Sequence, residues 1–217
     1  MKQEVLFIIL NEYADWESAF LAASLHSGLM PGSEIKYVVK TVAPTLDAVR
    51  SLGGFRTLPD YSFDTMPSDY AGLVLIGGMQ WQSPEAERIF PIVQDAFEKG
   101  KVIGGICNAA SFLCAHGFLN HVKHTGNTLA VLKQWGGERY TNEDGYLEKQ
   151  AVGDKNIVTA NGTGYLEFTR ELLLALKADT QEKIEAFYDF SKNGLEITTY
   201  SSSIRDNINY PMILFWL

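Results

Sequence analysis

The sequence predicts an α/β protein with a doubly wound, mostly parallel sheet that carries helices on both faces. Strand-like and helix-like runs alternate along the chain. The runs at residues 5–10 and 73–76 are continuously apolar, as is typical of strands buried on both faces. Glycine turns follow several strands, at residues 77–78, around Cys107 and at 161–164. The alternation and the buried runs predict the fold, and the glycine turns predict one edge where loops gather.

The elements are expected in the following order. Strands are predicted at residues 5–10, 35–42, 73–76, 102–106 and 157–160, with a hairpin about Gly53 and Gly54 within 47–58. Helices are predicted from an N-cap at Asp15 to Gly28 with an apolar face of Trp16, Phe20 and Ala23, then at 84–99, from Cys107 to Gly117, and at 127–135, 165–178 and 180–192. Residues 142–145 and 153–156 are predicted as turns.

We expect one domain over residues 1–217, in which 179–217 form a C-terminal extension. Its apolar end, residues 211–217, is expected to dock on the core or on a partner subunit.

Cys107 lies at the predicted switch from a buried strand to a helix. Gly104 and Gly105 precede it and Ala109 and Ala110 follow, so that strand and helix can approach closely. This pattern is typical of a nucleophile elbow. A helix N-terminus is expected to lower the thiol pKa, and the N–H of Asn108 can help to hold an oxyanion. The alternative is an ordinary buried core cysteine.

Composition limits the function. The chain has 217 residues and a net charge of −8, which disfavours nucleic acid and anionic membranes as partners. We expect no signal peptide and no disulfide, because Cys107 and Cys114 are two helical turns, roughly 10 Å, apart. A cytoplasmic protein is therefore predicted. Neither metal-ligand spacing nor a phosphate or dinucleotide motif is present, so we expect no metal and no cofactor.

Four residues are expected to meet at one sheet edge. Glu17 follows the first strand, Gly78 ends the strand at 73–76, Cys107 lies at the elbow and His124 follows seventeen residues later. Gly78 is a candidate second oxyanion donor, although a glycine pair also forms simple turns. Glu17 could equally be a solvated carboxylate at a helix start, and His124 an ordinary loop histidine.

The motifs together resemble the ThiJ/PfpI superfamily, which has the flavodoxin-type fold of class I glutamine amidotransferases. The resemblance covers roughly residues 4–178. It is carried by four segments, namely residues 13–17 (Tyr-Ala-Asp-Trp-Glu), 75–78 (Leu-Ile-Gly-Gly), 105–119 around Cys107, and 159–169 (Thr-Ala-Asn-Gly-Thr-Gly-Tyr-Leu-Glu-Phe-Thr).

The resemblance implies a reactive thiol at Cys107 in contact with Glu17. Because a carboxylate beside a thiolate is a like-charge pair, one of the two should hold a proton. The protease branch of the family has histidine directly after the cysteine, and here that position is Asn108. This difference puts a protease-type triad in doubt and leaves His124 as the substitute base.

Three functions remain open. The first is a cysteine-dependent enzyme, an amidase or glyoxalase-like catalyst, that acts on a small carbonyl or amide substrate. The second is an oxidation-sensing stress protein that uses the same cysteine without turnover. The third is an interaction module with a vestigial site. Under any of them, a homodimer is expected.

Overall fold

The protein is described by a computed structural model that covers residues 2–30 and 32–194. Its main sheet has seven strands, and a separate two-stranded sheet pairs β3 with β4. Across the main sheet lie β5 (Tyr61–Ser62), β2 (Tyr37–Ala43), β1 (Gln3–Ile8), β6 (Gly72–Leu75), β7 (Val102–Ile106), β9 (Ile157–Ala160) and β8 (Ala151–Asp154). All neighbouring pairs in this sheet are parallel except β8 with β9, which confirms the mostly parallel α/β prediction.

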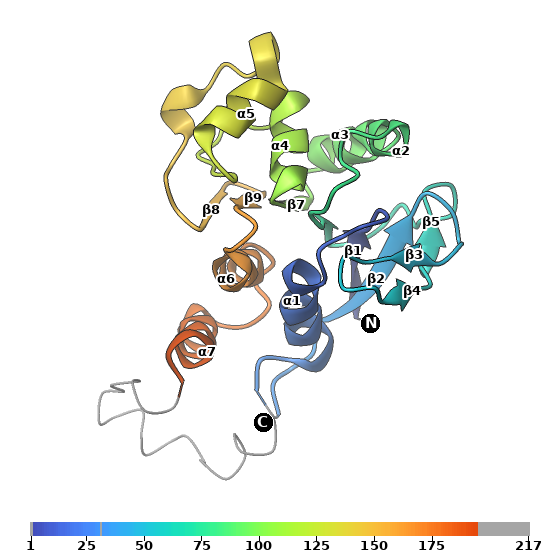
Figure 1. Cartoon of the computed structure of the whole chain (residues 1–217). Coiled ribbons are helices and arrows are strands. Elements are labelled where there is room, and N and C mark those ends of the chain that lie inside the picture. The colour runs from blue at the N-terminus through green and yellow to red at the C-terminus, as the bar shows by residue number, and fades with distance from the viewer. Residues whose placement is uncertain (1, 31, 195–217) are drawn as a thin grey trace.

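Helices cover both faces of the main sheet (Figure 1). One face carries α1 (Asp15–Ser27), α6 (Tyr165–Ala175) and α7 (Gln181–Asn193). The other carries α2 (Pro84–Glu87), α3 (Phe90–Glu98), α4 (Asn108–Ala115) and α5 (Leu129–Gly136), with short 3₁₀ turns at Gly137–Arg139 and Glu143–Gly145. Within the described ranges, no helix is both long and apolar enough to cross a membrane.

The first strand shows why the sheet has two cores. Leu6 and Ile8 belong to the core beneath α2–α5, whereas Phe7 and Ile9 belong to the core beneath α1, α6 and α7. Successive side chains of a strand point to opposite faces, so a strand covered on both sides must be apolar throughout. The continuous run at residues 5–10 is thus explained by burial on both faces.

The parallel register brings the loops together. Ile8 of β1 pairs with Leu75 of β6, which pairs with Gly105 of β7. Ile106 then pairs with Ala160 of β9. Four neighbouring strands therefore end at one edge of the sheet, and the loops that follow them emerge side by side.

Two predicted elements differ from the structure. The expected turn at residues 153–156 contains part of β8, which pairs with β9 as a hairpin through Lys155 at φ 53°. A four-residue strand that contains a glycine and ends in an aspartate carries little strand signal. The expected helix at 84–99 is two helices, interrupted at Arg88 and Ile89.

The start of the first helix also differs from the prediction. Ala14, and not Asp15, is the N-cap of α1, and the Asp15 carboxylate instead accepts a hydrogen bond of 2.7 Å from the Gly53 N–H. This contact fastens the β3–β4 hairpin (Val49–Arg50 and Arg56–Thr57) to the helix. The buried face of α1 consists of Glu17, Leu21, Ser24 and Leu25, so the predicted face of Trp16, Phe20 and Ala23 was wrong.

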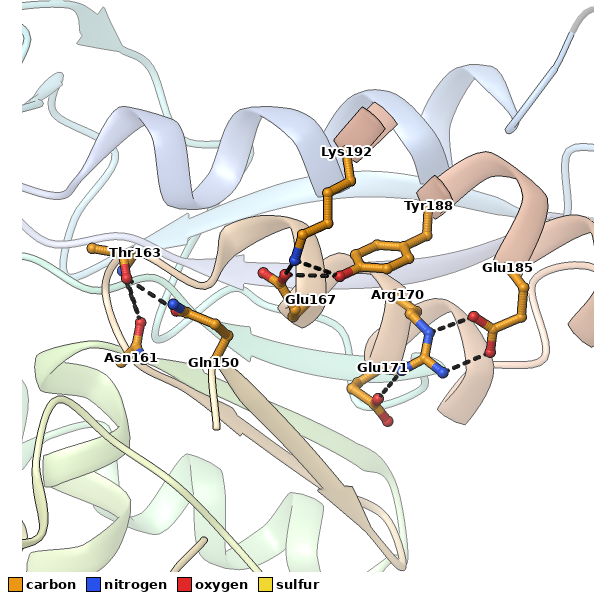
Figure 2. Close-up of polar contacts among 9 residues, drawn as sticks. All are labelled: Gln150, Asn161, Thr163, Glu167, Arg170, Glu171, Glu185, Tyr188 and Lys192. Atoms are coloured by element: carbon orange, nitrogen blue, oxygen red, sulfur yellow. Dashed lines mark hydrogen bonds and ion pairs between the residues drawn. The ribbon is translucent and has the colours of Figure 1, made fainter. Parts of the chain in front are cut away.

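Charged side chains join α7 to α6 (Figure 2). Arg170 donates two hydrogen bonds, of 2.6 and 2.7 Å, to the carboxylate of Glu185. Lys192 and Tyr188 both contact Glu167. The bidentate geometry of the Arg170 pair fixes the orientation of α7 more than a single surface contact would. The predicted docking of residues 211–217 lies outside the described residues.

Burial of Phe168 gives a test of the core beneath α6. This side chain is 0% exposed, whereas Phe97 on α3 is 46% exposed. We expect Phe168→Ala to lower the free energy of unfolding by about 3–5 kcal/mol, because it leaves a cavity. Phe97→Ala should cost no more than about 1 kcal/mol. Urea denaturation of both variants measures the difference, and equal losses would contradict the packing described here.

Candidate active site

Cys107 occupies a strained turn between β7 and α4. Its backbone lies at φ 58° and ψ −126°, and it is the N-cap of α4. A non-glycine residue in such a conformation costs on the order of 1–3 kcal/mol and persists only where its surroundings enforce it. A side chain at Gly105 would place its Cβ 2.6 Å from Leu113 Cδ1, so the close approach of strand and helix requires glycine there. The predicted elbow geometry is therefore present.

Glu17 meets Cys107 from the first turn of α1. The Glu17 side chain is 1% exposed, and both carboxyl oxygens lack a hydrogen bond of normal geometry to any described residue. A Cβ built on Gly162 would lie 3.1 Å from both the Cys107 Sγ and the Glu17 Oε1. One built on Gly77 would lie 2.2 Å from Glu17 Oε2. The carboxyl and the thiol thus share a space that two glycines leave open.

Burial controls the ionisation of this pair. It raises the pKa of Glu17 to about 7, although the nearby Cys107 thiol and Gly77 N–H act in the opposite direction. Burial also raises the pKa of the Cys107 thiol, and the negative charge of Glu17 raises it further. The expected lowering of the thiol pKa at the helix N-terminus was therefore wrong in direction. Near neutral pH the sulfur is protonated and the carboxyl is close to half ionised.

One backbone amide lies beside the sulfur. The Asn108 N–H favours the thiolate by pointing at Cys107, and Gly78 lies in the loop that follows β6. The Asn108 side chain donates a hydrogen bond of 2.8 Å to the Gly78 carbonyl. A Cβ on Gly78 would lie 2.4 Å from the Glu12 carbonyl oxygen, so no larger residue fits this approach. The two residues predicted as oxyanion donors are thus linked directly to each other.

Asn127 is a neighbour of the sulfur that the sequence did not single out. Its Nδ2 lies 3.4 Å from Cys107 Sγ, and its Oδ1 accepts a hydrogen bond of 3.0 Å from the Gly162 N–H. Asn127 is uncharged and lies in a segment whose titratable residue is His124, so its residue type alone does not indicate a catalytic role. Its only sequence signal is its place directly before Thr128, the N-cap of α5.

His124 does not join this group. It is fully buried, with Nδ1 at 2.9 Å from the Val122 carbonyl and Nε2 at 2.7 Å from the Tyr140 hydroxyl. Burial lowers the pKa of His124. Both ring nitrogens are engaged away from Cys107, and the side chain that reaches the sulfur from this loop is Asn127.

The turn after β9, residues 161–164, borders the space beside Cys107 and Glu17. Thr163 and Gln150 hold it together, because the Thr163 hydroxyl lies within hydrogen-bond distance of the side chains of both Asn161 and Gln150 (Figure 2). Trp16 Nε1 donates a hydrogen bond of 3.0 Å to the Gly162 carbonyl. Because Trp16 is half exposed, its ring lies at the solvent side of this turn.

Among residues 2–30 and 32–194, no three His, Cys, Asp or Glu side chains are grouped so that they could hold a metal ion. Both cysteines are free thiols.

Known proteins are similar to this chain over most of its length. Residues 3–175 match the model of the DJ-1/PfpI family. The uncharacterized protease YdeA of Bacillus subtilis is 39% identical over 193 residues, which cover 88% of this chain and 92% of the relative.

Two solved structures are also similar. The thiJ/pfpI family protein from Bacillus anthracis has a TM-score of 0.82 at 30% identity, covering 90% of this chain and 92% of that one. The DJ-1 superfamily protein Atu0886 from Agrobacterium tumefaciens has a TM-score of 0.78 at 31% identity, covering 90% and 100%.

The raised pKa of Glu17 makes stability depend on pH. The carboxyl binds its proton more tightly in the folded chain (about 7) than at its ordinary value of 4.5, so stability is lost as pH rises through this window. Glu17→Gln removes that loss. We expect its free energy of unfolding, relative to the unchanged protein, to increase by about 2 kcal/mol between pH 5 and pH 8.

Urea denaturation at both pH values measures this change. Glu182→Gln is a matched control, because Glu182 lies in the first turn of α7 but is exposed. A Glu17→Gln difference that stays constant with pH, as expected for the control, would show that Glu17 ionises normally.

Proposed function

Because the chain belongs to the DJ-1/PfpI family, we propose that it is a cysteine-dependent enzyme acting on a small carbonyl or amide substrate. The observation that carries this proposal is the buried, unpartnered Glu17 carboxyl beside the Cys107 thiol. Glu17 and Cys107 are the proposed proton carrier and nucleophile, with Gly78 and Asn108 as oxyanion donors.

The pKa of about 7 suits Glu17 to the role of general base. Its carboxylate takes the proton from the thiol as the sulfur attacks the carbonyl carbon. A carbon–sulfur bond forms, the π bond of the carbonyl opens and the electron pair moves to oxygen. The N–H groups of Gly78 and Asn108 stabilise this oxyanion.

Glu17 then acts as the acid. With an aldehyde that carries a neighbouring carbonyl group, Glu17 returns the proton to the oxyanion and gives a hemithioacetal. Glu17 then moves the proton of the sulfur-bearing carbon to the neighbouring carbon, whose carbonyl becomes a hydroxyl, and this leaves a thioester for water to hydrolyse. With an amide, the oxyanion collapses, the carbon–nitrogen bond breaks and the departing amine takes the proton from Glu17, which leaves a thioester for water to hydrolyse. Both routes begin with the same attack by sulfur on the carbonyl carbon. The chemical class of the substrate decides which route follows.

The geometry disfavours a histidine-based triad. Asn108 cannot accept a proton, and the ring nitrogens of His124 are bound to Val122 and Tyr140. Although YdeA is named a protease, the present chain uses a carboxyl where such a triad would use an imidazole. For this reason we favour small substrates over peptides.

An oxidation sensor is the second candidate, and the donors around the sulfur favour it. Protonated Glu17 and Asn127 Nδ2 can both donate to a negatively charged sulfur oxide. Peroxide would supply the oxygen, with the thiolate oxidised to sulfinic acid and two peroxide molecules reduced to water. A sensor would react in this way without turning over a carbonyl substrate.

Turnover of a panel of small aldehydes and primary amides tests the enzyme. We expect Cys107→Ser to abolish turnover and Glu17→Gln to lower kcat/KM on the order of 100-fold or more, because it removes the base. The rate should rise with an apparent pKa near 7, and Glu17→Gln should remove that limb. Cys114→Ala, which changes the other thiol, should retain activity.

Two results would sink the enzyme proposal. One is the absence of turnover across the panel while peroxide still converts Cys107 to sulfinic acid, which would favour the sensor. The other is turnover that survives Cys107→Ser. Retained fold in that variant, checked by circular dichroism, separates chemistry from unfolding.

A homodimer also remains a proposal. Exposed apolar side chains, including Phe55 and Leu58 in and after the β3–β4 hairpin, are compatible with an interface. Sedimentation equilibrium of the full chain measures its mass directly.

A further inference from the structure

We propose that Asn127 is a positioning residue that holds the Cys107 sulfur by donating an N–H to it and so favours the thiolate during attack. This inference rests on the proposed reactive role of Cys107, and it goes beyond that role by naming a side chain that stabilises the thiolate after Glu17 has taken the proton. It is carried by hydrogen bonds that fix the Asn127 amide at both ends.

The orientation of the amide follows from its partners. The Gly162 N–H can only donate, so the atom of Asn127 that lies 3.0 Å from it must be the carbonyl oxygen. The NH₂ group therefore faces the opposite way. One of its hydrogens points to Cys107 Sγ at 3.4 Å and the other to Asn108 Oδ1 at 3.5 Å.

Asn108 extends this chain of amides. It accepts from Asn127 and donates to the Gly78 carbonyl at 2.8 Å. The chain therefore connects the loops after β9, β7 and β6, with the sulfur beside its centre. Each of these groups is fixed by the next, so the donor to the sulfur has a defined direction.

Asn127 opposes the effect of Glu17 on the thiol. Glu17 is the ionisable side chain that faces the sulfur, from α1, and its charge favours the protonated thiol. The loops after β6 and β9 contribute Gly77, Gly78 and Gly162, which carry no charge. A hydrogen bond to an ionised acceptor is stronger than one to a neutral acceptor, so the Asn127 donor stabilises the thiolate more than the thiol.

A purely structural role explains the same residue poorly. Asn127 precedes α5, but that helix is already capped by Thr128, whose Oγ1 accepts from the Val131 N–H at 3.1 Å. The side chain of Asn127 is also only half-buried. Its hydrogen bonds join it to the sulfur, to Asn108 and to the Gly162 N–H rather than to the ends of α5.

The pH dependence of Cys107 alkylation by iodoacetamide tests the proposal in a Cys114→Ala background. Asn127→Asp keeps the shape and the bond from Gly162, but it removes both N–H donors and places negative charge beside the sulfur. We expect the alkylation rate at pH 7 to fall about tenfold or more, since each unit of thiol pKa changes the thiolate fraction tenfold. Asn127→Ala should give a smaller fall, of about threefold.

Asn120 offers a matched control. Its amide also joins two backbone groups, donating to the Arg139 carbonyl at 2.8 Å and accepting from the Thr141 N–H at 3.0 Å, away from Cys107. Asn120→Ala and Asn120→Asp should leave the thiol pKa unchanged. The proposal is overturned if both Asn127 variants keep the wild-type thiol pKa, whether or not their Tm falls.

This readout is independent of catalysis. If no substrate is turned over, the alkylation profile still reports the effect of Asn127 on the sulfur. If turnover is found but the Asn127 variants leave the thiol pKa unchanged, the enzyme proposal stands and the positioning role fails.

Discussion

The contact between a buried carboxyl and a half-buried thiol is the constraint on which the rest of the site depends. Removing the Glu17 carboxyl from water is unfavourable for its charged form, and a raised pKa is the physical consequence. The surroundings enforce the contact. Gly77 and Gly162 leave the space that the two groups occupy, and Cys107 adopts a backbone conformation that residues other than glycine rarely adopt.

The sheet makes this contact possible by bringing distant segments to one edge. Glu17, Cys107 and Gly162 are far apart in the chain but follow neighbouring parallel strands. Neutral amides, rather than charges, then fix the loops relative to one another. A site built in this way has one titratable pair, and its neighbours tune that pair without taking up protons themselves.

Some of this arrangement could be predicted from the sequence and some could not. The elbow was predictable because small residues on both sides of Cys107 are needed for close packing, and the structure shows the strand approaching the helix where Gly105 faces Leu113. The direction of the thiol pKa shift was not predictable. The helix terminus can be located from the local sequence, whereas the burial of the thiol and its contact with Glu17 arise from tertiary structure. Asn127 could not be identified because a single asparagine has no recognisable sequence motif. His124 was a candidate only because histidine is titratable.

The pairing of the first helix with the hairpin was equally hidden. An aspartate at a helix start predicts a cap, but Asp15 accepts instead from Gly53, thirty-eight residues away. The edge strand β8 is short and carries a glycine, so only its pairing with β9 identifies it. In both cases the hydrogen-bond partner, and not the local residue pattern, identifies the structure.

The burial of both Glu17 oxygens has a consequence for isotope exchange. A proton on this carboxyl has no direct access to bulk water, whereas the adjacent sulfur is half-buried and can be reached. If Glu17 removes a proton from a bound substrate, the same proton will tend to return to the product before solvent replaces it. A reaction run in deuterium oxide would then incorporate little label at the carbon concerned.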